Sequence, residues 1–174
     1  MDTGAIQPLL DEGERLLGRG ELETAERTFR SAVRTAPDSA VAHSKLGVAL
    51  AQQGRADEAI AEFSAAVALQ PTYAPAYSNL GNVYREKGML AEALAAYERA
   101  LAIDPEYWIA HRNLGILYKQ MGRLVDAVEH FKKATRLSVR SPPDPAKQRR
   151  GCLAGSAVLL GGVVLAAALA HRLL

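Results

Sequence analysis

Disulfide pairs, catalytic motifs and metal-ligand spacings are missing from this 174-residue chain. The one cysteine, Cys152, rules out an intramolecular disulfide framework. No two of the four histidines have the spacing of zinc ligands, and the glycines recur at regular intervals instead of forming a phosphate-binding loop. These absences predict a protein that is not an enzyme and that uses no catalytic residues, metal or other cofactor.

A basic surface is also missing from most of the chain. Residues 1–137 carry 16 Lys and Arg against 18 Asp and Glu, a net charge of −2, whereas residues 138–174 carry 5 against 1, a net charge of +4. Phosphate binding needs a basic stripe on the folded surface. Nucleic acid is therefore not an expected partner.

What the chain does contain is a pattern that returns every 34 residues. The clearest copy, residues 74–107, reads APAYSNLGNVYREKGMLAEALAAYERALAIDPEY. Its marker residues are Leu80, Gly81, Tyr84, Gly88, Ala93, Tyr97, Ala100 and Pro105. One step back the pattern gives Leu46, Gly47, Leu50, Gly54, Ala59, Phe63, Ala66 and Pro71, and one step forward Leu114, Gly115, Tyr118, Gly122, Ala127, Phe131 and Ala134. Residues 6–39 hold a more divergent copy.

The marker residues have physical roles that predict paired helices. Gly81 lacks a Cβ, so the first helix of the pair can approach the second closely. Gly88 stands where the first helix must stop, a place that favours positive φ. Tyr97 fills the space between helices, and Pro105 ends the second helix because it cannot continue one.

A 34-residue period with these residues resembles the tetratricopeptide repeat. The resemblance implies an all-α fold, a right-handed superhelix of antiparallel helix pairs with a concave groove. The predicted repeats are 6–39, 40–73, 74–107 and 108–141, within a domain of residues 6–137. The predicted helices are 6–18, 22–36, 40–53, 56–70, 74–87, 90–104, 108–121 and 124–137. In the first repeat Glu12 stands where the family usually has Leu, as expected of a terminal repeat with one face in water.

The resemblance also indicates which residues bind a partner. In this family the concave positions lie on the first helix of each repeat, which here gives Lys45, Asn79, Asn82, Arg85, Arg112, Asn113 and Lys119. The carboxylate clamp of co-chaperones matches only at Asn79, so that partner class is not expected. The run from Ala76 to Tyr84 is more similar to the O-GlcNAc transferase superhelix, where an asparagine ladder holds peptide backbone. Asn79 and Asn113 match the ladder position, and the alternative is that they keep a solvated helix face.

His43 and His111 share one repeat position, where inward-facing aromatic residues are usual in the family. We expect both to be packing residues of the helix pairs and not metal ligands or proton carriers.

No additional helix precedes the prolines that follow the last repeat. The apolar face of Leu124, Val128, Phe131 and Leu137 is therefore expected to be partly open as a contact surface. The alternative is that these residues pack against the first helix of the same repeat.

The C-terminal region has a different composition. Residues 138–150 are proline-rich and basic and predict an extended spacer. Residues 151–170 contain no charge, and about twenty residues at ~1.5 Å each can span a ~30 Å hydrocarbon core. The sequence predicts a tail-anchor-like transmembrane helix there, and the alternative is a helix that folds back onto the repeats.

The basic flank before this segment predicts that the repeats face the cytoplasm. The hypotheses for location are a bacterial inner membrane, which we favour, or the mitochondrial outer membrane. Gly162, Ala166 and Ala170 share one helix face, which permits a homodimer through the span.

The sequence therefore predicts a membrane-tethered scaffold that binds a partner protein or an extended peptide in its groove. The competing hypothesis is a soluble assembly adaptor or co-chaperone-like protein whose apolar C-terminal helix binds a partner.

Overall fold

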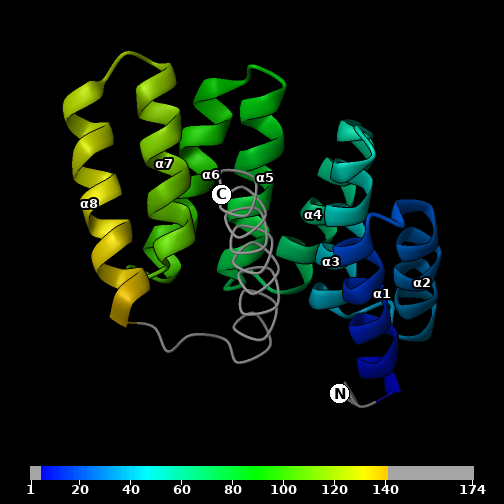
Figure 1. The fold of residues 1–174 in the computed structure, drawn as a ribbon. Coiled ribbons are helices and arrows are strands. Elements are labelled where there is room, and N and C mark those ends of the chain that lie inside the picture. The colour runs from blue at the N-terminus through cyan, green and yellow to red at the C-terminus, as the bar shows by residue number, and fades with distance from the viewer. Residues whose placement is uncertain (1–4, 141–174) are drawn as a thin grey trace, which may run out of the picture. The chain divides into compact units, whose positions relative to one another are not determined.

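The computed structural model describes residues 5–140, which form eight helices and no strand. The helices are α1 (Gln7–Arg19), α2 (Leu22–Thr35), α3 (Ala40–Gln52), α4 (Ala56–Leu69), α5 (Ala74–Glu86), α6 (Leu90–Ile103), α7 (Trp108–Gln120) and α8 (Leu124–Arg140). They stack as four successive antiparallel pairs, as Figure 1 shows. The predicted all-α repeat fold is confirmed for this part of the chain. Residues 141–150 of the predicted spacer and the predicted span at 151–170 lie outside the described residues.

The glycine between the helices of each pair explains their close approach. A Cβ placed on Gly81 would lie 2.5 Å from Cε1 of Tyr97, too close for any side chain. Tyr97 is completely buried, so its ring has no free space to move into. The predicted role of this glycine in helix packing is confirmed.

The turn inside each pair has the predicted left-handed residue. Gly20, Gly54, Gly88 and Gly122 all have φ between 76° and 78°, and a Cβ would meet no atom at any of them. The requirement at these positions is therefore conformational, because L-residues with a side chain adopt this φ at a cost.

The odd-numbered helices lie on the inner side of the stack. Helix α1 contacts α3, α3 contacts α5, and α5 contacts α7, in addition to the contacts within pairs. Within residues 5–140, contacts of this extent do not join α2 to α4 or α4 to α6. The stack therefore curves with the odd-numbered helices on its concave face.

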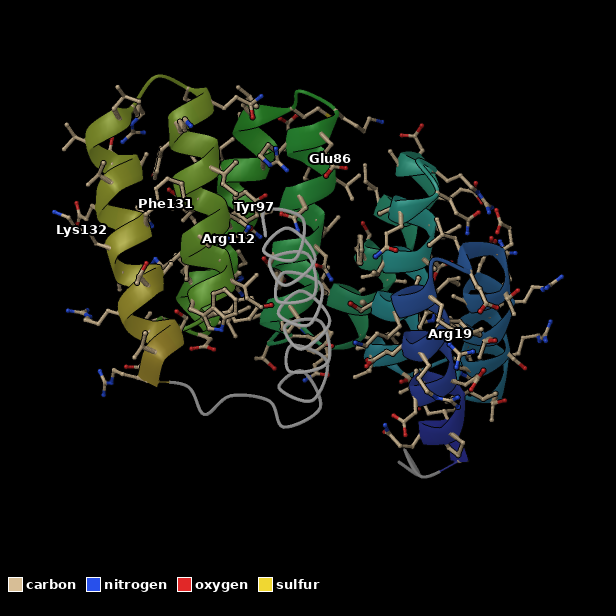
Figure 2. The ribbon with its side chains drawn as sticks, in the orientation of Figure 1. Arg19, Glu86, Tyr97, Arg112, Phe131 and Lys132 are labelled. Atoms are coloured by element: carbon tan, nitrogen blue, oxygen red, sulfur yellow. The ribbon has the colours of Figure 1, made fainter. Side chains whose placement is uncertain are left out.

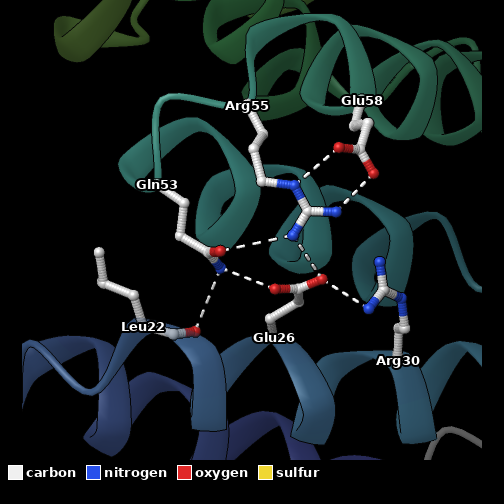
Figure 3. Close-up of polar contacts among 6 residues, drawn as sticks. All are labelled: Leu22, Glu26, Arg30, Gln53, Arg55 and Glu58. Atoms are coloured by element: carbon white, nitrogen blue, oxygen red, sulfur yellow. Dashed lines mark hydrogen bonds and ion pairs between the residues drawn. The ribbon is translucent and has the colours of Figure 1, made fainter.

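The junction between the first two pairs contains a polar cluster around a buried carboxylate. Glu26 on α2 is 5% exposed and accepts from Nε2 of Gln53 at 2.9 Å and from Nη1 of Arg55 at 2.8 Å, while Arg30 lies 2.6 Å away (Figure 3). Burial alone would raise the pKa of Glu26, but these hydrogen bonds and the charges of Arg30 and Arg55 lower it below its ordinary value. The later junctions have Ile60 and Leu94 at the position of Glu26, so neither has a buried carboxylate there, although Lys87 and the exposed Asp57 form an ion pair at the second junction.

The end of α8 differs from the prediction. The helix continues to Arg140, so Ser138, Val139 and Arg140 are helical and do not belong to the extended spacer. The hydroxyl of Ser138 donates to the carbonyl oxygen of Thr135 at 2.9 Å, and the first proline comes only at position 142. No described helix is both long and apolar enough to cross a membrane.

Candidate partner-binding site

The concave face has a small cavity between the second and third helix pairs. Its volume is about 250 Å³. Its lining residues are Val48, Ala51 and Gln52 from α3, Phe63 from α4, and Asn79, Asn82, Val83 and Glu86 from α5. The floor is apolar and the rim carries three side-chain amides, a combination that suits an extended peptide with an apolar side chain.

Asn82 is held in place by the tyrosine of its own repeat. The hydroxyl of Tyr97 donates to Oδ1 of Asn82 at 2.7 Å. Burial raises the pKa of Tyr97, although Arg85 opposes this shift, so the hydroxyl stays protonated and remains a donor. With its oxygen occupied, Asn82 presents its NH2 group as a donor at the cavity.

Asn79 and Asn113 differ, although they share one repeat position. Asn79 is half-buried, lines the cavity and forms no side-chain hydrogen bond with another described residue. Asn113 is only 7% exposed, and its Nδ2 donates to Oγ of Ser78 at 3.3 Å. The two ladder residues are therefore not equivalent, because Asn113 already joins α7 to α5.

The charged residues predicted for the site do not converge on the cavity. Lys45 forms an ion pair with Glu14 on α1 at 2.5 Å, and Arg85 lies 3.7 Å from Glu86. Arg112, which Figure 2 labels, and Lys119 are exposed on α7, and neither forms an ion pair with described residues. The structure therefore brings Asn79 and Asn82 together at the cavity, and the predicted basic residues do not line it.

Phe63 is one of the cavity residues that sequence reasoning missed. It lies on an even-numbered helix, whereas the predicted site used only the first helix of each repeat. The signal was present in the sequence, because Phe63 is the aromatic marker that fills the space beside Gly47.

The two histidines at the shared repeat position pack inside their helix pairs, as predicted. Nε2 of His43 and of His111 lies 3.0 Å and 3.1 Å from the carbonyl oxygens of Pro37 and Pro105. Their Nδ1 atoms have different partners, the carboxylate of Glu62 at 2.7 Å for His43 and Nδ1 of His130 at 3.1 Å for His111.

The environment of the His111–His130 pair favours the neutral form of both imidazoles. Nε2 of His111 donates to a carbonyl, so neutral His111 accepts at Nδ1 from Nδ1–H of His130. Burial lowers the pKa of both imidazoles. The charge of Lys133 adds to this lowering at both rings, whereas Asp104 beside His111 and Glu129 beside His130 oppose it. No group of three or more His, Cys, Asp or Glu within residues 5–140 could hold a metal ion.

Stacked helix pairs with a concave cavity define a helical-repeat protein of the kind that binds other proteins. Tetratricopeptide repeat models match residues 10–74, 62–95 and 110–146, and a TPR repeat model matches residues 81–122. A comparison with curated protein sequences finds no match.

Solved structures agree with the family models. The crystal structure of MamA is 31% identical, and the match covers 78% of this chain and 79% of MamA with a TM-score of 0.65. PilF of Pseudomonas aeruginosa is 29% identical, with coverage of 80% and 64% and a TM-score of 0.72. A thermophilic TPR protein of Thermus thermophilus is 26% identical, with coverage of 76% and 74% and a TM-score of 0.71. The chain belongs to the tetratricopeptide repeat family, whose fold is typically a non-enzymatic protein-interaction scaffold.

Proposed function

We propose that this protein is a scaffold that binds an extended segment of a partner protein along its concave face. The observation that carries the proposal is the cavity between α3 and α5, with an apolar floor, the amide of Asn79 without a described partner and the NH2 group of Asn82 at its rim. A side-chain amide both donates and accepts, so it can pair with the backbone of any sequence. Asn79 and Asn82 would hold the peptide backbone while the space over Phe63 and Val83 takes one apolar side chain.

The contribution of the other predicted residues follows from their present partners. Asn113 would have to exchange its bond with Ser78 before it could hold a peptide, so its main role is to join α5 and α7. Lys45 is engaged with Glu14 and contributes less than Asn79. Arg112 and Lys119 are exposed cations beyond the cavity, and they would select a partner with acidic residues at the fourth repeat.

The experiment is site-specific photocrosslinking in cells, followed by titration of the captured partner. A photoreactive residue at Gln52, which faces the cavity, captures the partner. The Asn79→Ala and Asn82→Ala double variant should then bind that partner about three- to tenfold more weakly, the usual cost of lost neutral hydrogen bonds. Lys45→Ala should bind within about twofold of the parent. Unchanged binding by the double variant, with unchanged helicity, would place the site elsewhere.

We further propose that residues 151–170 tether the scaffold to a membrane. The support is their length without charge and the basic residues that precede them, which favour a cytoplasmic domain and, for this composition, a bacterial inner membrane. Pairing of two spans through Gly162, Ala166 and Ala170 would give a homodimer. The competing function is a soluble adaptor whose apolar segment binds a partner.

Alkaline carbonate extraction separates these two functions. The tethered scaffold stays in the membrane pellet, whereas the soluble adaptor is released. Leu160→Arg with Val164→Arg should release the protein, because each charge at mid-span costs ~2.5–3.5 kcal/mol on insertion scales. A parent protein that is already released by carbonate would rule out the tether.

A further inference from the structure

The last helix of the stack, α8, has a face that in earlier repeats packs against another helix. In α4 and α6 this face packs against the first helix of the next repeat, through Ile60 and Val67 in α4 and through Leu94 and Leu101 in α6. The equivalent residues of α8 are Val128 and Thr135. Val128 is 51% exposed, so nothing among the described residues covers this position.

The exposed face of α8 forms a continuous apolar stripe. It consists of Leu124, Val128, Phe131 and Thr135, which fall on one side of the helix at spacings of three and four residues. Leu124 is 62% exposed and Phe131 is half-buried, so the predicted openness of this face is confirmed at Leu124 and Val128. The prediction is wrong for Leu137, which is 5% exposed.

A charged rim borders the stripe on one side. Lys132 and Arg136 stand next to it, and together with Val128, Phe131 and Thr135 they line a shallow hollow. Figure 2 shows Phe131 directed toward the neighbouring helix α7 and Lys132 pointing away from the stack. The equivalent residues of α6 are Glu98 and Ala102. The basic rim is therefore present on α8, the uncovered helix, and absent from α6.

We infer that this face docks an amphipathic helix of a partner protein that carries acidic residues beside its apolar stripe. Like charges disfavour a second copy, because two α8 faces would bring Lys132 and Arg136 of both copies together. A head-to-tail second copy is disfavoured too. Its α1 would bury Glu12 and Arg15, which form an ion pair where internal repeats have buried Leu80 and Val83.

The test uses two synthetic peptides with the sequence of α7. This helix was chosen because it packs on the face of α6 that is equivalent to the open face of α8. Both keep the apolar residues Ala110, Leu114, Leu117 and Tyr118. The acidic probe carries His111→Glu and Gly115→Glu, and the basic probe carries His111→Lys and Gly115→Lys. These two positions face α8 in the protein, so on a lone helix docked against α8 they would lie on the side of Lys132 and Arg136.

Fluorescence anisotropy with the full chain at low salt should show the acidic probe binding about fivefold more tightly than the basic probe. Val128→Asp should abolish binding of both probes, and its high exposure makes this variant compatible with folding. Lys132→Glu with Arg136→Glu should reverse the preference between probes. The matched control Arg27→Glu with Arg34→Glu, an equal charge change at two exposed positions of α2, should leave both affinities unchanged.

Five results would overturn the inference. Equal affinity for both probes, or binding that survives Val128→Asp, would exclude this charge-selective face. Self-association of the parent that Val128→Asp abolishes would make a second copy the occupant. Binding to anionic vesicles that requires Val128, without peptide binding, would make a membrane surface the occupant. A disulfide formed between Thr135→Cys and Cys152 within one chain would make the chain's own C-terminal segment the occupant.

Discussion

The two ends of the repeat stack are built on opposite plans. At the first end, α1 has Glu12 and Arg15 where internal repeats bury apolar residues, and the two side chains pair with each other in water. At the last end, α8 keeps Val128 and Phe131 in the register of an internal helix, with Val128 51% exposed and Phe131 only half-buried. Solenoids need polar outer faces on their terminal repeats to stay soluble. The described residues of the first end meet that need, and at the last end the proposed partner helix would meet it.

The largest expected difference between the ends concerns the packing glycines. At Gly13 a Cβ would lie 2.3 Å from Cε1 of Phe29, which is fully buried, so Gly13→Ala should lower the free energy of unfolding by about 2–3 kcal/mol. At Gly115 the nearest atom is Cε1 of Phe131 at 2.7 Å, and that ring is half-buried and can tilt toward solvent. Gly115→Ala should therefore cost about 1 kcal/mol or less. Urea unfolding followed by circular dichroism measures both, and equal losses would show that the last end is as closed as the first.

The second difference concerns the ionic junction beside the first end. Glu26→Ala should lower the free energy of unfolding by about 2 kcal/mol, because it removes charge-assisted hydrogen bonds from Gln53 and Arg55. Glu23→Ala removes an exposed carboxylate from the same helix and should change stability by less than about 0.5 kcal/mol. The same urea experiment serves for both. A loss for Glu26→Ala no larger than that for Glu23→Ala would mean that the cluster in Figure 3 is not a stabilising contact.

The third and smallest difference is in the response to acid. The pKa values of His111 and His130 are lowered by burial, so the unfolded chain binds more protons and the last pair loses stability as the pH falls below about 6.5. The pKa of Glu26 is also lowered, so the stability that this carboxylate adds to the first junction is present above about 4.3 and lost only as the pH falls further. Mild acid should therefore open the last pair first.

Hydrogen exchange, corrected for its intrinsic pH dependence, can follow each helix separately. Amides of α7 and α8 should lose protection in mild acid while those of α1 and α2 keep theirs. His130→Ala, which copies Ala96 of the third repeat, should reduce this pH dependence. Simultaneous loss at both ends would contradict the assignment of the effect to the histidine pair.

The fold was predictable because its determinants repeat. Glycines equivalent to Gly81 and Gly88 occur at the same offsets in every copy, and this regularity indicated the helix pairs from the sequence alone. Seven of the eight helices end within one residue of the prediction. The exception is α8, where the end depends on hydrogen bonding after Leu137 and no repeat partner was available for comparison. Asn79 and Asn113 could not be told apart in sequence, because the bond from Asn113 to Ser78 joins residues one repeat apart. The role of Phe63 in the cavity likewise arises from packing between repeats.

The most direct test of the open end is to make the first end complementary to it. Glu12→Leu with Arg15→Val restores the residues that internal repeats use to pack against a preceding helix, as Leu80 and Val83 do. Analytical ultracentrifugation of this variant and of the parent, under identical conditions, then reports whether α8 accepts the altered α1 of another copy. We expect concentration-dependent association beyond that of the parent, lost again when Val128→Asp is added. A variant with the same mass distribution as the parent at all concentrations would contradict the claim that α8 presents a free helix-binding face.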